Sequence, residues 1–295
     1  MNAANGLPPP LDPSRPERVA LVTGASSGIG TETARGLLRL GYRVVVVGRD
    51  ATRTREVREQ LSRESAAAVD HLVADFSSLS AVDALATEFL NRYQRLDALV
   101  NNAGLWHPKR SLSVDGYEDT FAVNHLAPFL LTCRLEQLLR ATPRARVVTV
   151  SSRLHVRVPS FDFADVMSEA RYRGVYVYAK SKLANILFAN QLAKRLKPFG
   201  CTSNSVHPGS VSTHVVRDSK WLSLGARLPL PFLKTPAQGA ETSIYVATAP
   251  ELDGVTGVYF ADARAHVPSV AAQDTQAAAQ LWKLSQGLVA PFTEG

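Results

Sequence analysis

The sequence predicts an α/β protein in which helices cover both faces of one doubly wound parallel sheet. Short runs rich in Val and Leu recur along the chain with little polar alternation, which is typical of strands buried on both faces. Stretches of about 20–45 residues with helical spacing of apolar residues separate these runs. Strands that alternate with helices in this way join through right-handed crossovers into a parallel sheet.

Each expected strand is a β-branched or apolar run that precedes a polar or glycine-containing segment. The expected strands are residues 19–23, 43–47, 71–75, 98–102, 146–150, 202–206 and 258–260. Helical spacing is clear after the first of them, at Leu37 and Leu38, and after the third, from Leu79 to Phe89. A later helix should begin at Thr235, because Pro236 suits the first helical position and Gln238 completes a capping box.

No segment in the middle of the chain resembles a linker, so we expect one domain over residues 17–290. Residues 1–16 carry five prolines and little periodicity, which predicts a flexible tail. Residues 212–234 interrupt the alternation with an irregular apolar stretch. A segment of this kind is expected to form a lid over a ligand.

Composition excludes several classes of protein. The chain has 295 residues and 45% hydrophobic residues, too many for a disordered protein. Its two cysteines cannot form a disulfide framework, and neither has a second ligand at metal-binding spacing. The N-terminus lacks the apolar core of a signal peptide and no run is long enough for a membrane span, so we expect a soluble cytoplasmic protein. The net charge of +7 is scattered, which argues against a nucleic-acid interface.

A glycine-rich turn joins the first expected strand to the first helix, and its sequence is Thr-Gly-Ala-Ser-Ser-Gly-Ile-Gly at residues 23–30. Glycine lets the backbone turn tightly and approach a pyrophosphate, whose charge the helix N-terminus stabilises. The sequence therefore predicts a Rossmann-like dinucleotide site. Its expected cofactor contacts are Gly24, Ser26, Ser27, Gly28, Ile29 and Gly30.

The end of the second strand indicates which dinucleotide is bound. A carboxylate there would bind the ribose 2′-hydroxyl of NAD, whereas Arg would bind the 2′-phosphate of NADP. The strand is followed by Gly48, Arg49 and Asp50. Arg49 favours NADP(H). Asp50 leaves NAD(H) possible, since it suits either the ribose or the N-cap of the next helix.

Several motifs occur in the order found in one family: residues 23–30, Asn-Asn-Ala-Gly at 101–104, Ser-Ser at 151–152, a Tyr-x-x-x-Lys motif and Pro-Gly at 208–209. The chain resembles the short-chain dehydrogenase/reductase (SDR) family over about residues 18–285. The segments 123–132, 181–196 and 206–213 are similar to its retinol-dehydrogenase-like branch. The resemblance implies hydride transfer between NAD(P) and a carbonyl or alcohol.

Two frames fit the Tyr-x-x-x-Lys motif, Tyr176 with Lys180 and Tyr178 with Lys182. The resemblance favours the second, because the branch continues Ser-Lys-Leu-Ala-Asn and Ser181 precedes Lys182. A nearby ammonium group lowers the pKa of a phenol, so Tyr178 is expected to act as general acid and base.

The resemblance implies the remaining site residues. Ser152, with Ser151 as the alternative, would hydrogen-bond the substrate oxygen, and Asn124 would help hold Lys182 through an ordered water. His125 and His207 are expected to serve packing. Further cofactor contacts would be made by Asp75, Asn102, Ala103, Gly104, Tyr178, Lys182, Pro208, Gly209 and Thr213.

These residues predict an NADP(H)-dependent oxidoreductase that interconverts a hydrophobic ketone or aldehyde and its alcohol. An apolar substrate pocket is expected between residues 153–177 and the segment 212–234. A non-catalytic dinucleotide sensor, or an epimerase or lyase on the same fold, are the alternatives. By analogy with the family, we expect a homodimer or homotetramer. The proline-rich N-terminus, where membrane-bound members of the branch carry an apolar anchor, argues against a retinoid substrate.

Overall fold

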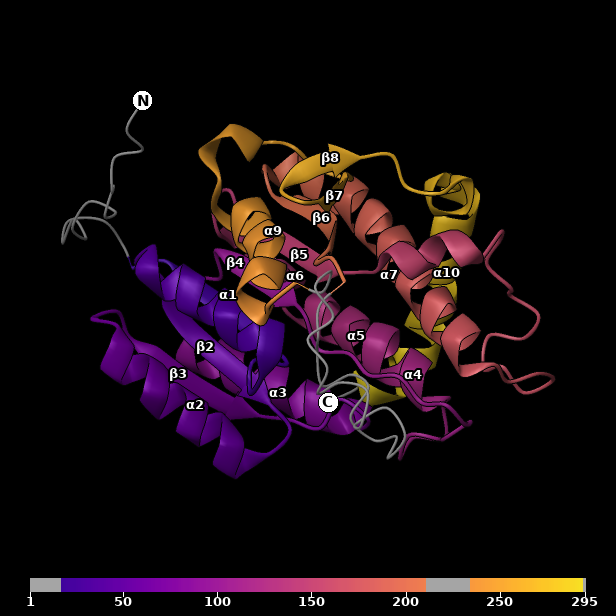
Figure 1. The fold of residues 1–295 in the computed structure, drawn as a ribbon, viewed down its shortest axis with the longest axis horizontal. Helices are drawn as coiled ribbons and strands as arrows, with labels where there is room; N and C mark the ends of the chain where they lie inside the picture. Colours follow the sequence, from indigo (N-terminus) through magenta and orange to yellow (C-terminus); the bar gives the residue numbers. More distant parts are fainter. Residues whose placement is uncertain (1–16, 211–233, 294–295) are drawn as a thin grey trace.

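The computed structural model describes residues 17–210 and 234–293. One eight-stranded sheet runs through it in the order β3-β2-β1-β4-β5-β6-β7-β8 (Figure 1). Neighbouring strands are parallel except β8, which pairs antiparallel with β7. The strands are β1 (Val19–Thr23), β2 (Arg43–Gly48), β3 (Val69–Val73), β4 (Ala98–Asn101), β5 (Arg146–Val150), β6 (Thr202–His207), β7 (Tyr259–Ala261) and β8 (Arg264–His266). This order confirms the doubly wound Rossmann-like α/β fold.

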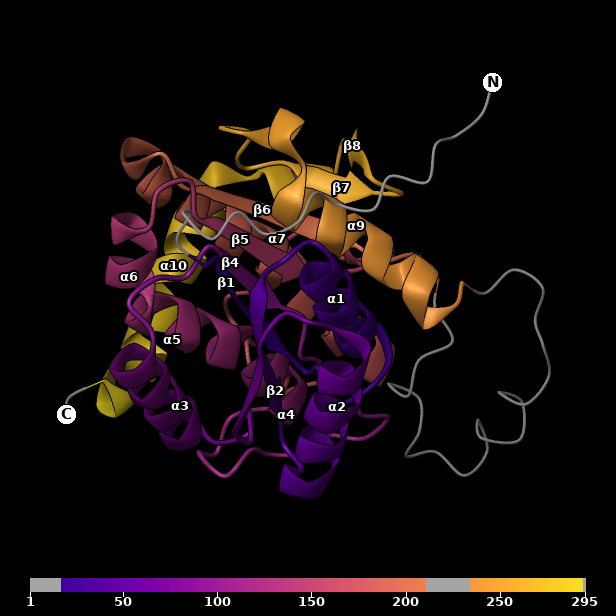
Figure 2. The ribbon, with the colours of Figure 1, turned by 90° about the vertical axis from the view of Figure 1, so that its left-hand side faces the viewer.

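Helices cover both faces of the sheet. In Figure 2, α1, α2 and α9 lie on one side of the strands and α3, α5 and α10 on the other. The helices are α1 (Gly28–Arg39), α2 (Ala51–Glu64), α3 (Leu79–Arg92), α4 (Asp119–Phe121), α5 (Ala127–Arg134), α6 (Glu136–Ala141), α7 (Gly174–Leu196), α9 (Pro236–Thr248) and α10 (Thr275–Val289), with a π-helical turn, η1, at Ala122–Leu126.

Five of the seven expected strands have limits that differ from the observed ones by one or two residues, and one observed strand was not expected. The third was expected at residues 71–75, but β3 spans Val69–Val73 and pairs with β2 up to Gly48. Asp75 lies in a turn, where its backbone carbonyl accepts a hydrogen bond from the amide of Ser78 (3.0 Å). The short β8 was not expected, because its exposed residues carry no apolar pattern.

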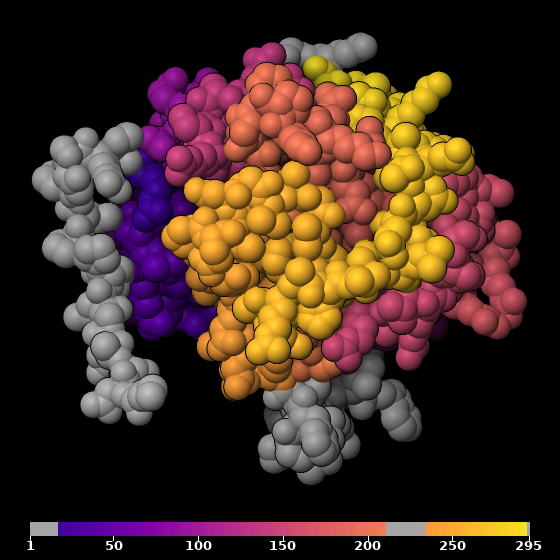
Figure 3. All heavy atoms as spheres, turned by 90° about the horizontal axis from the view of Figure 1, so that it is seen from above, coloured from indigo at the N-terminus to yellow at the C-terminus, as the bar shows by residue number. Residues whose placement is uncertain are grey.

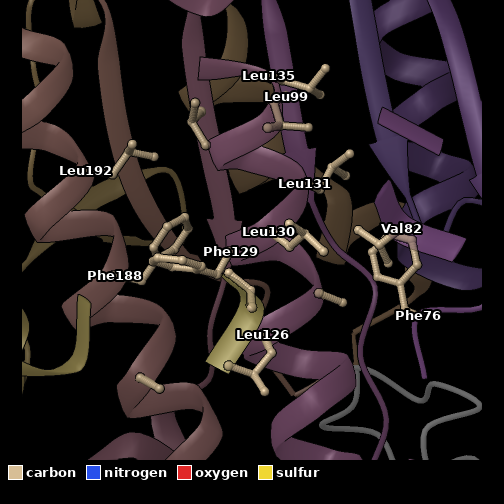
Figure 4. Packing of buried hydrophobic residues seen from close by; sticks show 14 of the residues in the cluster. Phe76, Val82, Leu99, Leu126, Phe129, Leu130, Leu131, Leu135, Phe188 and Leu192 are labelled. Atoms are coloured by element: carbon tan, nitrogen blue, oxygen red, sulfur yellow. The ribbon is translucent and has the colours of Figure 1, made fainter. Parts of the chain in front are cut away.

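The hydrophobic core consists of two layers, one on each face of the sheet. On the larger side, side chains of α5 meet those of α7. Figure 4 shows Phe129 beside Phe188 there, and their ring centroids are 5.6 Å apart. Because strand side chains alternate between the faces, the central strands contribute to both layers, which explains their lack of polar alternation.

The expected helix start at Thr235 is confirmed. The hydroxyl of Thr235 accepts a hydrogen bond from the amide of Gln238, and the Gln238 side chain accepts one from the amide of Thr235. Figure 3 shows the residues from α9 to β8, in orange to yellow, in the middle of the face that is turned to the viewer. The expected tail at 1–16 lies outside the described residues, as does the expected lid at 212–234 apart from Lys234.

Helix length and apolarity in the described part of the chain also bear on membrane association. None of the helices within residues 17–210 and 234–293 combines the length and the apolarity that crossing a bilayer requires.

Candidate functional site

The glycine-rich turn between β1 and α1 has the backbone geometry that a phosphate loop requires. Gly24 and Gly28 have positive φ angles of 64° and 58°, which disfavour other residues. A Cβ on Gly30 would lie 2.3 Å from the carbonyl oxygen of Gly24, so only glycine fits there. Ser27 precedes the first turn of α1 and makes no side-chain capping hydrogen bond, and Ile29 lies within that turn. This helix N-terminus therefore presents backbone amides that can bind an anion.

A hydrogen-bond network joins this turn to the segment that follows β4. The Thr23 hydroxyl accepts hydrogen bonds from the backbone amides of Asn102 and Ala103, both at 3.0 Å. The Asn102 side-chain amide donates to the carbonyl oxygens of Thr23 (2.9 Å) and Gly24 (3.3 Å). The Asn102 side chain therefore connects the segment after β4 to the glycine-rich turn after β1. Thr23 was not singled out from the sequence, although a threonine between a buried strand and a glycine is a recognisable signal.

The end of β2 has no room for a side chain at its last residue. A Cβ on Gly48 would lie 2.3 Å from Thr54 Oγ1 and 2.9 Å from Ser26 Oγ. Asp50 is the N-cap of α2, since its carboxylate accepts a hydrogen bond from the backbone amide of Arg53 (2.8 Å). Arg49 is exposed and forms no ion pair within the described residues. Of the charged residues directly after β2, Arg49 is therefore the one whose side chain is not engaged in capping.

The other expected cofactor residues lie at the same edge of the sheet. Asp75 follows β3, and its carboxylate accepts a hydrogen bond from the backbone amide of Ser77 (3.0 Å). Pro208 and Gly209 follow β6, and Gly209 has a φ angle of 89°. A Cβ there would lie 2.6 Å from the side chain of Lys234. Thr213 lies outside the described residues.

Tyr178 and Lys182 lie one turn apart on α7, with Lys182 Nζ 5.5 Å from the centroid of the Tyr178 ring. Lys182 Nζ donates a hydrogen bond to the carbonyl oxygen of Val150 (3.0 Å). Burial lowers the pKa of Lys182 to about 8. Burial raises the pKa of Tyr178 to about 12, and a hydrogen bond with the Ser152 side chain opposes that rise. The Lys182 ammonium is thus buried beside a partly exposed phenol. The expected lowering of the pKa of Tyr178 by Lys182 is not seen, because burial of the phenol dominates.

The two serines after β5 point in different directions. The Ser151 hydroxyl is buried and donates a hydrogen bond to the carbonyl oxygen of Lys182 (2.7 Å). The Ser152 hydroxyl accepts a hydrogen bond from the amide of Leu154 (3.2 Å) and contacts Tyr178. Successive residues of an extended chain face opposite sides, so only Ser152 lies beside the phenol.

Asn124 lies in the π-helical turn and is completely buried. Its amide nitrogen donates to the carbonyl oxygen of Leu105 (2.9 Å) and to Ser181 Oγ (3.0 Å). Its amide oxygen accepts from the backbone amide of Leu105 (2.7 Å). A Cβ placed on Gly104 would lie 3.2 Å from Asn124 Oδ1 and 3.3 Å from Lys182 Nζ. Asn124 and Lys182 thus converge on Gly104.

The other Tyr-x-x-x-Lys frame does not form a comparable pair. Tyr176 lies in the first turn of α7, and its side chain is 37% exposed. Lys180 is buried and donates hydrogen bonds to the carbonyl oxygen of Asp165 and to Ser168 Oγ, both at 2.7 Å. The structure therefore brings together only Tyr178, Lys182 and Ser152.

Both histidines beside these motifs are buried. His125 Nε2 hydrogen-bonds Ser285 Oγ (2.8 Å), and burial lowers its pKa to about 3. His207 Nδ1 accepts a hydrogen bond from the backbone amide of Arg153 (3.3 Å), and burial lowers its pKa to about 4. Neutral, hydrogen-bonded imidazoles fit the packing role expected of them.

The residues expected to form a substrate wall between Ser152 and Tyr178 pack partly against the core. Phe161 is buried, with its ring centroid 4.8 Å from that of Phe163. Val166 and Met167 also pack against the core from partly buried positions. The Tyr172 hydroxyl donates a hydrogen bond to the carbonyl oxygen of His107 (3.0 Å). This segment is thus anchored to both the core and the loop after β4.

Comparison with known proteins identifies the family of this chain. Residues 18–221 match the model of the short chain dehydrogenase family. Retinol dehydrogenase 14 of Mus musculus is 41% identical over 289 residues, a match that covers 92% of this chain and 86% of that protein.

Solved structures share the fold of this chain. A protein from Mycobacterium paratuberculosis has a TM-score of 0.75 and 30% identity, with 92% of this chain and 93% of that chain covered. The Pseudomonas aeruginosa RhlG/NADP active-site complex has a TM-score of 0.66 and 28% identity, with 86% and 96% covered. The chain therefore belongs to the short-chain dehydrogenase/reductase family, in its retinol-dehydrogenase-like branch, and is an NAD(P)-dependent oxidoreductase acting on CH–OH and C=O groups.

Proposed function

We propose that the protein uses NADP(H) to interconvert a hydrophobic ketone or aldehyde and its alcohol, with Tyr178 as general acid and base. One observation carries the chemical part of this proposal. Tyr178 lies between Lys182, whose Nζ is 5.5 Å from the ring centroid, and the hydroxyl of Ser152. Within the described residues, no other tyrosine has both a lysine ammonium and a strand-end serine hydroxyl beside it.

The residues at the carboxyl edge of the sheet fit a dinucleotide. Gly24 and Gly30 let the turn pack closely on itself and against Asn102 and Ala103, where a Cβ would clash. The first amides of α1 have no side-chain cap and would bind a pyrophosphate. Lys182 would hold the nicotinamide ribose, and the loop ending at Gly104 would line the cofactor. When bound, the cofactor supplies the hydride and, in its oxidised form, a positive charge beside the phenol.

The side chains then provide proton transfer and orientation. Because burial keeps the pKa of Tyr178 near 12, the phenol is protonated at neutral pH and ready to donate its proton to the carbonyl oxygen. Ser152 would hydrogen-bond the same oxygen as negative charge develops on it. In the oxidative direction, the ammonium of Lys182 favours the phenolate that accepts the alcohol proton.

The preference for NADP(H) rests on the end of β2. A carboxylate at residue 48 would clash with Thr54 Oγ1, and the carboxylate of Asp50 is occupied as a helix cap. Arg49 remains as the exposed cation beside the expected 2′-phosphate position. The structurally similar P. aeruginosa protein was solved as an NADP complex, which supports the same preference.

A lipophilic substrate is supported by the branch to which the chain belongs. Its relative at 41% identity carries the name of an enzyme for retinol, a largely apolar alcohol. The segment between Ser152 and Tyr178 is rich in apolar side chains, which suit such a substrate.

Activity should be tested with NADPH and a panel of lipophilic aldehydes and ketones. We expect Tyr178→Phe to lower kcat/KM by about 10²–10⁴-fold, the usual contribution of a positioned proton donor. Tyr176→Phe is the matched control, because this tyrosine is exposed two residues away, and it should retain wild-type activity. If Tyr178→Phe keeps the rate within a few-fold, Tyr178 does not transfer the proton.

Cofactor preference has a separate test. Arg49→Ala should weaken NADPH binding by about tenfold or more, the scale of a charge-assisted hydrogen bond, and leave NADH binding unchanged. Arg53→Ala is the control, since Arg53 is exposed in the first turn of α2. Equal losses for both cofactors would refute the assignment of Arg49 to the 2′-phosphate.

A further inference from the structure

Lys180 is a buried cation that the proposed chemistry does not use. It lies between Tyr178 and Lys182 in sequence, but two residues along a helix correspond to a rotation of about 200°. Its side chain therefore leaves α7 on the side away from the proposed acid–base pair. Lys180 is only 2% exposed, and lysine is rarely buried to this extent without a specific partner.

The partners of Lys180 belong to the segment between Ser152 and Tyr178. Its ammonium group donates hydrogen bonds to the carbonyl oxygen of Asp165 and to Ser168 Oγ, both at 2.7 Å. It forms no ion pair with a carboxylate among residues 17–210 and 234–293. The buried charge is therefore stabilised by hydrogen bonds to neutral acceptors of one loop, residues 161–170, and by the charges of the nearby carboxylates of Asp165, Asp162 and Glu118.

This loop is an ordered structure built around polar contacts. The Asp165 carboxylate accepts hydrogen bonds from the backbone amides of Glu169 (2.7 Å) and Ala170 (3.2 Å). Ser168 has a φ of 51°, a left-handed conformation that costs free energy for a residue with a Cβ. The contact with the Lys180 ammonium helps to offset that cost, because charged hydrogen bonds are stronger than neutral ones.

The loop is also held from its outer side. Arg110 donates a hydrogen bond to the carbonyl oxygen of Met167 (3.3 Å) and forms an ion pair with Glu169 (3.3 Å). Arg110 belongs to the segment that follows Gly104, against which Lys182 and Asn124 lie. Lys180 on one side and Arg110 on the other therefore connect the loop to two elements of the proposed site.

We propose that Lys180 is a positioning residue that fixes the loop 161–170 as a wall of the substrate site, and so sets affinity for the carbonyl compound without taking part in proton transfer. This inference rests on the proposed function. The loop lies between Ser152 and Tyr178 along the chain, and Arg110 ties it to the segment after Gly104, so on this proposal it borders the space beside the phenol. The contacts of Tyr178 with Ser152 and of Lys182 with Val150 do not involve this loop.

The test compares Lys180→Met with Lys194→Met, an exposed lysine on the same helix. With NADPH and the aldehyde that the wild type reduces best, Lys180→Met should raise KM by about tenfold, keep kcat within about twofold and leave the Kd of NADPH unchanged. A higher KM with an unchanged kcat is expected when a variant loses interactions that bind the substrate and the transition state equally well. Lys194→Met should match the wild type, and Lys180→Arg should recover part of the loss.

Ser168→Ala provides a milder variant in case Lys180→Met folds poorly. It removes one acceptor and should raise KM by about threefold, the scale of one hydrogen bond. When Ser168→Ala is combined with Lys180→Met, it should cause no further increase in KM beyond that of Lys180→Met, because the hydroxyl then has no ammonium to contact. Hydrogen exchange at the amides of Glu169 and Ala170 should be faster in Lys180→Met than in Lys194→Met.

Three results would overturn the inference. An unchanged KM in Lys180→Met, with only a lower melting temperature, would show a purely structural lysine. A loss of kcat together with NADPH binding would place Lys180 in the acid–base unit. A wild type that reduces no carbonyl compound would refute the proposed function, and the inference about Lys180 would fall with it. The two failures are distinguishable, because the inference fails alone when the wild type is active and Lys180→Met gives either of the first two results.

Discussion

Keeping Lys182 charged should lower the stability of this protein, so that Lys182→Met is both inactive and more stable than the wild type. Lys182 is 3% exposed, and burial lowers its pKa from 10.5 to about 8. At about 1.36 kcal/mol for each tenfold change in proton affinity, this lowering of the pKa corresponds to roughly 3 kcal/mol of destabilisation at pH 7. This figure is an upper limit, because the variant also loses the hydrogen bond to Val150.

The loss of that hydrogen bond leaves no orphaned acceptor. The carbonyl oxygen of Val150 also accepts a hydrogen bond from Asn185 Nδ2 (3.1 Å), so it stays satisfied when Lys182 is replaced. We therefore expect Lys182→Met to raise the free energy of unfolding by about 1–3 kcal/mol at pH 7. At about 2–4 °C per kcal/mol, the melting temperature should rise by several degrees.

The dependence on pH identifies the cause. Below pH 8 Lys182 is protonated in both the folded and the unfolded protein, so the full cost of burying the charge is present. Between pH 8 and 10.5 only the unfolded protein holds the proton, and the stability contributed by this group rises with pH. The advantage of Lys182→Met over the wild type should therefore be largest below pH 8 and shrink toward pH 10.5.

Urea unfolding of both proteins without cofactor, at several pH values from 7 to 10, measures this difference. Titrations shared by the two proteins cancel in the comparison. Lys194→Met, which replaces an exposed lysine on the same helix, should show a difference near zero at every pH. A Lys182→Met variant that is less stable than the wild type at pH 7, or an advantage that does not change with pH, would refute the reasoning.

Three further substitutions test the cofactor cradle by calorimetric titration with NADPH and by thermal unfolding. Gly30→Ala should abolish NADPH binding, because its Cβ would lie 2.3 Å from the carbonyl oxygen of Gly24; retained affinity would contradict this geometry. Asn102→Leu should lower stability by about 1–3 kcal/mol, since it leaves the carbonyl oxygen of Thr23 without its amide donor, and should weaken cofactor binding as the two loops separate. Asp50→Ala should cost about 0.5–2 kcal/mol of stability as a lost helix cap without changing the affinity for NADH, and a selective loss of NADH binding would instead make Asp50 a ribose ligand.

The alternation of apolar runs and helical stretches was enough to predict the sheet, because buried parallel strands leave a strong pattern. The strand limits were harder to predict where polar residues are buried. The expected third strand ended at Asp75, but hydrogen bonds from the amides of Ser77 and Ser78 draw this residue into a turn. The antiparallel β8 was missed, since its three residues are exposed and depend on pairing with β7 alone.

Sequence motifs identified the candidate residues of the site but not how their side chains are directed. Ser151 and Ser152 are equivalent in the pattern, and only the contacts of each hydroxyl separate them. The two Tyr-x-x-x-Lys frames could be ranked by resemblance, whereas the role of Lys180 depends on a loop that lies 10 or more residues earlier in the chain. Tertiary contacts of this kind have no periodic signal.

The π-helical turn Ala122–Leu126 shows why part of the site was beyond prediction. All residues from Glu118 to Thr132 are buried, so burial alone does not distinguish Asn124 and His125. The turn directs the two side chains to different partners, with Asn124 bonded to Leu105 and His125 bonded to Ser285. Such turns are less stable than α-helix and recur at functional sites. Here the three hydrogen bonds of Asn124 offset that cost and fix the loop on which the Lys182 ammonium converges, so local helix geometry and the proposed chemistry depend on the same side chain.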